Sequence, residues 1–304
     1  MKIKTIISAL VGLVVFAGSF GVHAQSGLSS VEPLFEYPKV PDQLTKVNMR
    51  SNYMVLHLWD ECPLDKEDIT NVESFRETFS DFVSFFVLAD YDEVEKGVKK
   101  FVDKVVKNKT NLNSVLGFVD TEIFAPQSRH WSDDVYTIFA KALLDNRKVD
   151  KNVKAMLETN LQMLANSKLD TQLGNLTFVN PRDGKASLYD LTSEYVFVFF
   201  NTDGSVDDSI YKLRLNTDVA TNTLIKNGNI SIVSVYSGTT PDAKLEGEPE
   251  NWYVAKLDNM QQTYDMRVKP TLYILSKDKK IIAKSPAVSQ ILGMTAQMKA
   301  ALNL

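Results

Sequence analysis

Cysteine is nearly absent from this sequence, which has Cys62 as its single one among 304 residues. One thiol cannot form an intramolecular disulfide, a Cys-x-x-Cys redox pair or a cysteine-rich zinc site. Basic charge is also scarce, because 34 Lys and Arg against 38 Asp and Glu leave a formal net charge of −4. Such a balance has no electrostatic footprint for nucleic acid. With 13 glycines and 10 prolines, the chain is not collagen-like or of low complexity. We therefore expect a folded protein with no cofactor and no nucleic acid partner.

The first residues have the pattern of a secretory signal. Lys2 and Lys4 precede an apolar stretch from Ile6 to Val22, and Val22-His23-Ala24 offers small side chains at the positions that a signal peptidase reads. The alternative is an uncleaved anchor, for which the stretch is short. We predict a signal peptide over residues 1–24, cleaved after Ala24, and a periplasmic or secreted mature protein without a membrane span.

Export gives the lone thiol two possible states. In an oxidising compartment, an odd cysteine is either buried and inert or paired with a second molecule. Free cysteine is among the most buried residue types, which favours burial of Cys62. An intermolecular disulfide through Cys62 remains the alternative.

The remaining chain divides into an extended segment over residues 25–47, a helical domain over 48–168 and a third region over 169–304. Apolar residues at helical spacing predict an amphipathic helix, with further helices after Ser132 and around residues 153–164. The core face of the first is Val94, Val98, Phe101, Val102 and Val105. Short connections between such helices favour an antiparallel helical bundle.

After residue 173 the pattern changes to short strands. Two runs at 176–179 and 187–190 flank the turn sequence Asn180 to Gly184, and Tyr195–Phe200 is a continuous apolar run typical of a buried strand. We expect a helix over 207–226, a strand over 230–236, a long loop, a hairpin over 271–284 and a helix over 288–302. The chain is thus predicted to be α+β or α/β, with a mixed sheet in its C-terminal domain.

Residues 173–304 resemble a thioredoxin-like domain of the TlpA/ResA type. The segment Val268-Lys269-Pro270-Thr271-Leu272-Tyr273 and the hairpin after it are similar to the stretch that carries a cis-proline in that family. The resemblance implies the same isomer at Pro270. Residues 30–166 resemble the helical domain of unknown function that precedes such domains in secreted proteins of Gram-negative gut bacteria. Asn48–Tyr53, His57–Asp60 and Phe124–Ser128 carry that second resemblance.

The chain departs from the family at the redox motif. Aligning Val198–Asp203 with the family's first core strand and turn places Ser205-Val206-Asp207-Asp208 where Cys-x-x-Cys stands. A serine hydroxyl cannot undergo disulfide exchange, and Asp208 suits a helix start. We expect no catalytic residue here, with Ser205 and Asp208 as the degenerate cysteine positions.

The fold's shallow groove between this turn and the proline loop can pair with an extended peptide through backbone hydrogen bonds. The candidate groove comprises Thr202, Gly204, Ser205, Trp252, Lys269 and Pro270. For Trp252, which follows Pro249 in the long loop, a position in the core is an equal alternative. We therefore expect a redox-inactive secreted protein, not an enzyme, that binds a peptide or protein partner non-covalently. Two alternatives stay open: an oxidoreductase-family member with residual or lost enzyme activity, and a structural envelope protein that acts through its helical domain.

Other polar clusters offer weaker candidates for chemistry. His57, Asp60, Glu61 and Cys62 lie within six residues, but their side chains would not converge if His57–Trp59 ended a strand, so we predict no metal site. His130 lies beside Arg129 and Trp131 without a nucleophile-elbow sequence, which argues against a hydrolase. The acids Asp203, Asp207 and Asp208 lack the spacing of a calcium loop and are expected to cap a helix.

Overall fold

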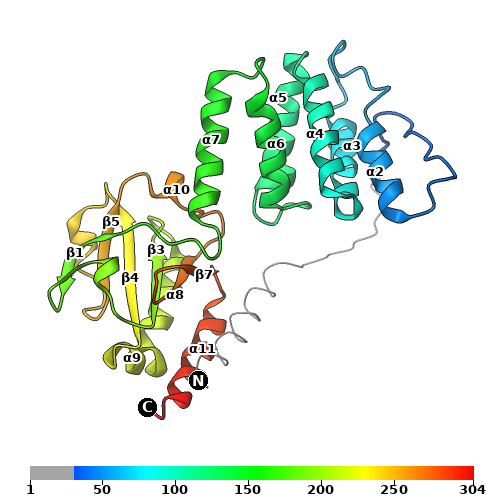
Figure 1. Cartoon of the computed structure of the whole chain (residues 1–304). Helices are drawn as coiled ribbons and strands as arrows, with labels where there is room; N and C mark the ends of the chain where they lie inside the picture. The colour runs from blue at the N-terminus through cyan, green and yellow to red at the C-terminus, as the bar shows by residue number, and fades with distance from the viewer. Residues whose placement is uncertain (1–30) are drawn as a thin grey trace. The chain divides into compact units, whose positions relative to one another are not determined.

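The computed structural model describes residues 31–304, and the predicted signal peptide lies outside them. The described residues form two compact units, residues 31–161 and Gln162–Leu304. Figure 1 shows helices in the first and a sheet with helices in the second. Among residues 31–304, no helix is both long enough and apolar enough to cross a membrane.

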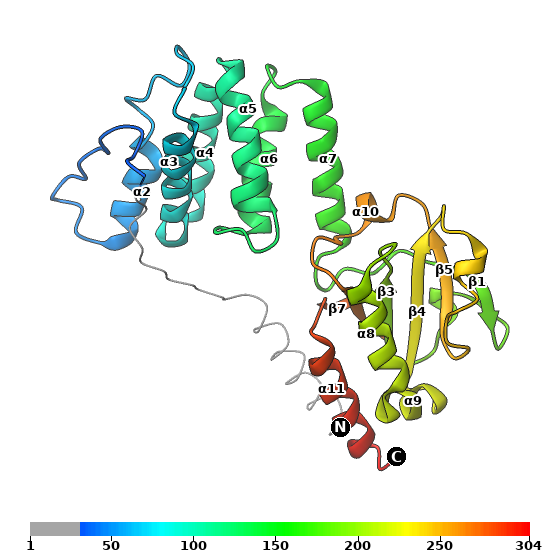
Figure 2. The ribbon, with the colours of Figure 1, turned by 180° about the vertical axis from the view of Figure 1, so that it is seen from behind.

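The N-terminal unit is helical, as predicted. Its helices are α2 (Val47–His57), α3 (Val72–Ser84), α4 (Tyr91–Val105), α5 (Lys109–Phe118), α6 (Asp133–Asp145) and α7 (Lys151–Asn166), the last of which continues into the second unit. Asn71, Asn108 and Ser132 cap α3, α5 and α6 by accepting backbone N–H groups three residues on. Figure 2 shows α4 between α2 and α6, each of which it contacts.

The buried face of α4 is the predicted one. Val94, Val98, Phe101, Val102 and Val105 are at most 4% exposed. Phe101 packs in an aromatic cluster whose rings come from four helices and the segment after α2, comprising Trp59, Phe75, Phe79, Phe82, Phe101, Phe118 and Phe139. Aromatic burial of this extent dominates the core of the unit.

The C-terminal unit is built on a mixed seven-stranded sheet of order β2-β1-β5-β4-β3-β6-β7. Its strands are β1 (Thr177–Arg182), β2 (Lys185–Ser187), β3 (Tyr195–Phe200), β4 (Ile230–Ser237), β5 (Tyr253–Leu257), β6 (Thr271–Ser276) and β7 (Ile281–Lys284). Strand β4 runs parallel to β3 and β5, whereas β6 runs antiparallel to β3. The predicted mixed sheet is confirmed.

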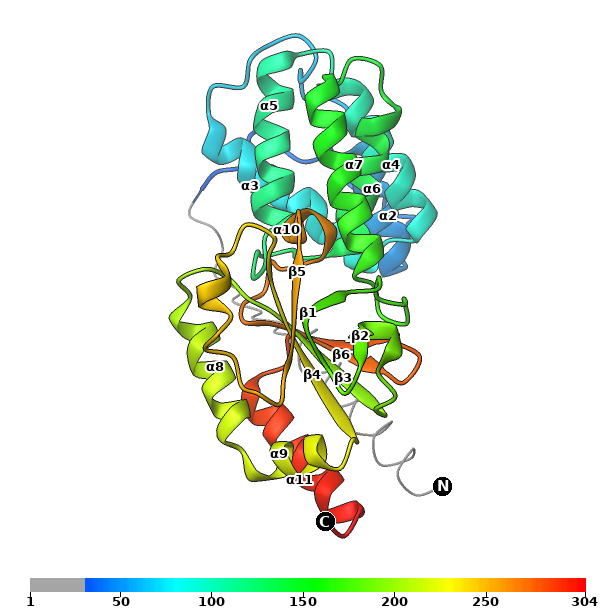
Figure 3. The same ribbon diagram turned by 90° about the vertical axis from the view of Figure 1, so that its left-hand side faces the viewer.

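Helices α8 (Val206–Thr217), α9 (Val219–Lys226) and α11 (Val288–Ala301) cover one face of the sheet. Figure 3 shows these three helices together on one side of the strands. Alternation along β3 divides the core, because Phe197 and Phe199 face the helices while Val196, Val198 and Phe200 face the other side. The core on that second face also includes Leu173 before β1, Leu188 after β2 and the short helix α10 (Met260–Thr263).

Three local predictions differ from the structure. Residues 188–190 form a 3₁₀ turn instead of a strand. The predicted helix over 207–226 is two helices, because Asp218 has an extended backbone and its carboxylate caps α9 by accepting the Thr221 N–H. The predicted long loop contains α10 and β5, and β5 is held by its pairing with β1 and β4.

Strand register determines which loops meet at the end of the sheet. Phe200, the last residue of β3, lies opposite Thr271, the first residue of β6. The segment after Phe200 and the residues before Thr271 therefore lie at the same end of these two strands. The Lys269–Pro270 bond is cis, as the resemblance implied.

Candidate functional site

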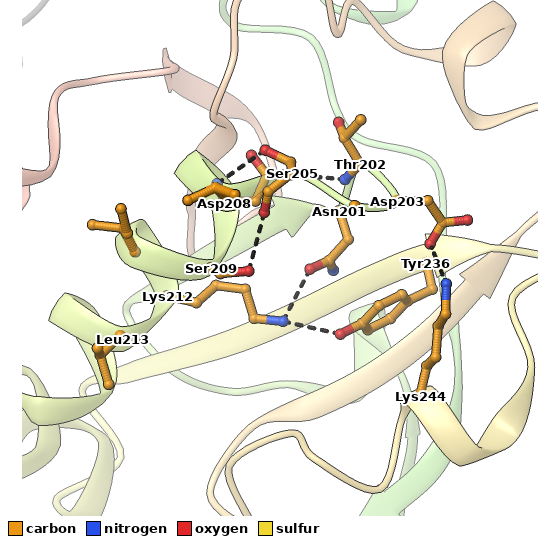
Figure 4. A pocket seen from close by; sticks show the side chains of 13 residues that line it. Asn201, Thr202, Asp203, Ser205, Asp208, Ser209, Lys212, Leu213, Tyr236 and Lys244 are labelled. Atoms are coloured by element: carbon orange, nitrogen blue, oxygen red, sulfur yellow. Dashed lines mark hydrogen bonds and ion pairs between the residues drawn. The ribbon is translucent and has the colours of Figure 1, made fainter.

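The start of α8 is held by Ser205 and Asp208, the two residues that the resemblance aligns with the cysteines of the family's redox motif. Ser205 is the N-cap, and its Oγ accepts the backbone N–H of Asp208 at 3.1 Å. Asp208 Oδ2 in turn accepts the backbone N–H of Thr202 at 2.7 Å, and its side chain is buried. Gly204 between them has a φ of +74°, a conformation that suits glycine. Figure 4 shows this closed arrangement of loop and helix.

A partly buried ionic cluster lies one turn further along α8. The ammonium group of Lys212 donates to Asn201 Oδ1 and to the Tyr236 hydroxyl, both at 2.9 Å, and forms an ion pair with Glu248. The Tyr236 hydroxyl also donates to Glu248. Burial, followed by this carboxylate, raises the pKa of Tyr236 above its usual value. The cluster joins α8, β4 and the loop that carries Glu248.

These two groups border one pocket of about 580 Å3. Its lining includes the turn after β3, one side of α8, Tyr236 and Lys244, which pairs with Asp203 at 3.3 Å (Figure 4). Of the predicted groove residues, the lining contains Thr202, Gly204 and Ser205. The polar groups of the lining include Lys212, whose ammonium is already hydrogen-bonded within the protein. Val206, Ile210 and Leu213 contribute apolar surface.

Lys269 and Pro270 lie at the same end of the sheet but do not line this pocket. Lys269 is exposed, and across residues 31–304 no hydrogen bond involves its backbone. Asp265 stabilises the segment that leads to Lys269, because its carboxylate accepts hydrogen bonds from Arg267 at 2.8 and 3.0 Å and from Lys284 at 3.1 Å. Burial acts to raise the pKa of Asp265, but Arg267 and Lys284 outweigh it and lower the value to about 2.

The prediction that Trp252 lines the groove is wrong. Its side chain is completely buried in the core beneath the helices, together with Phe197, Leu215 and Leu224. The residue follows Pro249 and Trp252 N–H donates to the carbonyl of Pro249 at 2.9 Å, which turns the chain into β5. A loop position in the sequence did not reveal this burial.

The pocket also contains residues that the sequence did not single out. Lys212 follows Asp208 by one helical turn, so its position on the same side of α8 could have been inferred. Tyr236 and Glu248 come from 24 and 36 residues further along. No local sequence pattern connects either residue to Lys212: Tyr236 is brought near by the parallel pairing of β3 with β4, and Glu248 by the loop that precedes β5.

The candidate residues of the helical unit are engaged in packing. Cys62 is 2% exposed, and its burial raises its pKa to about 11 despite the opposing charge of Lys104. His57 ends α2 and is not part of a strand; its Nδ1 lies 2.9 Å from Asp60 Oδ2. Among the described residues, no three His, Cys, Asp or Glu side chains are grouped to hold a metal ion.

His130 lies within hydrogen-bonding distance of the Ser80 hydroxyl, a contact that the sequence did not reveal. Its Nε2 lies 2.7 Å from Ser80 Oγ, to which Arg129 also donates at 3.0 Å. Burial, with the charge of Arg129, lowers the pKa of His130 to about 4. Because Ser80 is 1% exposed, the contact links α3 to the loop before α6 within the core.

Comparisons with known proteins find a family model for the N-terminal part and solved structures that are similar to this chain. A family model described as a domain of unknown function, DUF5106, matches residues 17–167. A thioredoxin-like protein from Bacteroides caccae ATCC 43185 is similar in structure at 19% identity, over 88% of this chain and 99% of that chain, with a TM-score of 0.63. The thioredoxin domain of a thiol-disulfide oxidoreductase from Bacteroides vulgatus is similar at 16% identity, over 43% of this chain and 97% of that chain, with a TM-score of 0.36. No curated protein matches the sequence.

Proposed function

Since the chain joins a helical DUF5106 domain to a thioredoxin-like domain without a Cys-x-x-Cys pair, we propose that it is a redox-inactive binding module of the periplasm or cell exterior. It holds an extended peptide segment non-covalently at the sheet end that carries the loop after β3 and the loop before β6. The predicted signal peptide supports the location.

One observation carries the redox part of the proposal. The two residues aligned with the family's cysteines stabilise the helix start. Ser205 Oγ accepts the backbone N–H of Asp208, and Asp208 Oδ2 accepts the backbone N–H of Thr202. Thiol–disulfide exchange needs a thiolate as the attacking group. The single thiol, Cys62, is buried in the other unit, so no attacking group stands at this site.

The binding part depends on the open backbone at Lys269. Extended peptides add to an exposed sheet end or edge through main-chain hydrogen bonds. Lys269 is an exposed residue and its backbone makes no hydrogen bond within residues 31–304, whereas the neighbouring Val268 carbonyl accepts the Thr271 hydroxyl at 2.7 Å. A peptide strand passing the sheet end can therefore pair with Lys269 without displacing an internal bond.

The redox part is tested by insulin reduction with dithiothreitol as the electron donor. We expect the protein to leave the rate at the uncatalysed value. Cys62→Ser serves as the matched control, because activity that this variant loses would assign turnover to Cys62. If Cys62→Ser still catalysed insulin reduction, the conclusion that the protein cannot perform thiol–disulfide exchange would be refuted.

The binding part is tested with peptides selected from a random displayed library on the immobilised protein. Affinities are then measured for Lys269→Pro, which removes the backbone N–H, and for Lys269→Ala, which retains it. We expect Lys269→Ala to bind within about twofold of the parent and Lys269→Pro to bind at least about tenfold more weakly, equivalent to about 1.4 kcal/mol. In addition, the Lys269 amide signal should shift on peptide addition in an NMR titration. Failure to select any peptide, or an unchanged Lys269 amide signal, would refute binding at this place.

A further inference from the structure

Helix α8 has an apolar stripe on its outer side, opposite the side that enters the core. The stripe consists of Val206, Ile210 and Leu213, which are 69%, 51% and 60% exposed. Their spacing of four and then three residues places them along one line of the helix. The same helix packs Tyr211 and Leu215 into the core, so the stripe is additional to what folding requires. Contiguous exposed apolar residues of this kind mark interaction surfaces.

Two opposite charges flank the stripe on one side. Asp207 and Arg214 are seven residues apart, which is about 10.5 Å along the helix, and both are exposed. Neither forms an ion pair with any residue in 31–304. The other flank of the stripe carries Ser209 and Lys212, and both this flank and the stripe itself line the pocket (Figure 4). The charges thus lie beside the stripe and away from the pocket.

A partner helix for this surface must meet three requirements. It needs apolar residues at the same spacing, a basic group at the height of Asp207 and an acidic group at the height of Arg214. Helix α8 meets all three when a second copy is turned antiparallel. Consider a twofold axis perpendicular to the two helices, at the height midway between residues 207 and 214. This axis places Asp207 of each copy beside Arg214 of the other copy, so that two ion pairs form. Flanking charges of this type specify orientation and partner in helix pairs.

We propose that this chain forms a homodimer in which α8 packs antiparallel on α8 of a second copy through Val206, Ile210 and Leu213. The contact is isologous and therefore closes without further growth. Helix α8 has 12 residues, about 18 Å, so this patch is smaller than the roughly 800 Å2 per partner of a standard interface. The dimer is accordingly reversible and dependent on concentration. The contact does not use Lys269, but its three apolar residues also line the pocket beside the loop after β3.

The test is analytical ultracentrifugation of the whole chain, purified after export, over a series of protein concentrations in reducing buffer. We expect a monomer–dimer equilibrium whose dissociation constant rises at least about tenfold in Val206→Asp and in Ile210→Asp. Val219→Asp is the matched control, because Val219 is also the first residue of its helix and is 70% exposed. That variant should dimerise as the parent does.

Charge exchange tests the antiparallel arrangement separately. Asp207→Arg and Arg214→Asp should each weaken the dimer, because each places like charges together at both ends. The double variant should restore the parental dissociation constant. A monomer at every concentration, a dimer unaffected by Ile210→Asp, or a double variant no better than either single one would each overturn the proposal. Circular dichroism of every variant verifies that α8 is still folded.

Discussion

The buried carboxylate of Asp265 should make the thioredoxin-like unit sensitive to acid. Its side chain is 7% exposed and is bonded by Arg267 and Lys284. We expect Asp265→Asn to destabilise this unit at neutral pH, because asparagine has the same shape but supplies no negative charge to the two cations. The loop that precedes Lys269 depends on the same residue, since the Asp265 carbonyl accepts the Tyr273 hydroxyl at 2.8 Å.

The magnitude follows from the pKa. Burial opposes ionisation of Asp265, yet the two cations lower its pKa from 3.8 to about 2. Since one pKa unit corresponds to about 1.36 kcal/mol, the ionised form contributes about 2 kcal/mol to the free energy of unfolding. A lowered carboxyl pKa means that this contribution is complete above pH 4 and is lost as the pH falls towards 2. The difference between parent and Asp265→Asn should therefore shrink over that interval.

Urea unfolding at a series of pH values measures this difference. Fluorescence reports on the sheet unit alone when Trp59 and Trp131 are replaced by phenylalanine, which leaves Trp252 as the single tryptophan. The control is Asp242→Asn, whose carboxylate is 88% exposed although it pairs with Lys256 at 2.5 Å. Exposed pairs contribute up to about 1 kcal/mol, so this variant should change little. A loss for Asp265→Asn that is equal at pH 7 and pH 2 would refute the electrostatic explanation.

Three further predictions concern packing. Trp252→Ala should lower the free energy of unfolding by about 3–5 kcal/mol, because the ring is 0% exposed; a nearly unchanged melting temperature would contradict its burial. Gly97→Ala should destabilise the helical unit by about 1–3 kcal/mol, because the added Cβ would lie 2.4 Å from Val55 Cγ1 and 2.6 Å from its carbonyl oxygen, whereas Gly117→Ala meets nothing within 4 Å and should be neutral or stabilising in thermal melts. Cys62, with its pKa raised to about 11 by burial, should resist thiol reagents in the native protein and react fully in urea; rapid native labelling would show that it is accessible.

The sequence allowed the fold to be predicted where the pattern is local. The run Tyr195–Phe200 is continuous and apolar, and it forms β3 with the same bounds. The amphipathic spacing of α4 likewise identified its buried face. Strand β5 was missed because Tyr253–Leu257 is short and follows a polar segment. Its position depends on pairing with β4 and β1, and no residue near it in sequence indicates those partners.

The candidate site was predictable to the same extent. Ser205 and Asp208 were identified because a resemblance supplied the alignment, and the capping chemistry of serine and aspartate agreed with it. The Lys212–Tyr236–Glu248 cluster was not, because its members come from α8, β4 and a loop. For Trp252 the sequence leaves a groove position and a core position equally open, because position within a loop does not determine burial, and the structure buries it.

The capping of α8 predicts how the loop before this helix responds to a change of redox conditions. In a thiol oxidoreductase, the turn at the helix start contains the bond that forms and breaks, so its local structure changes with redox state. Here the same turn is held by hydrogen bonds at 3.1 Å and 2.7 Å from backbone N–H groups to Ser205 and Asp208. A typical N-cap is worth about 1 kcal/mol, and neither bond depends on an electron donor. The loop before α8 should therefore keep one conformation in oxidising and reducing buffer, with unchanged amide signals at Thr202 and Asp208. Such constancy would suit a module that binds a segment without reacting with it, and a redox-dependent shift of these two signals would argue against that role.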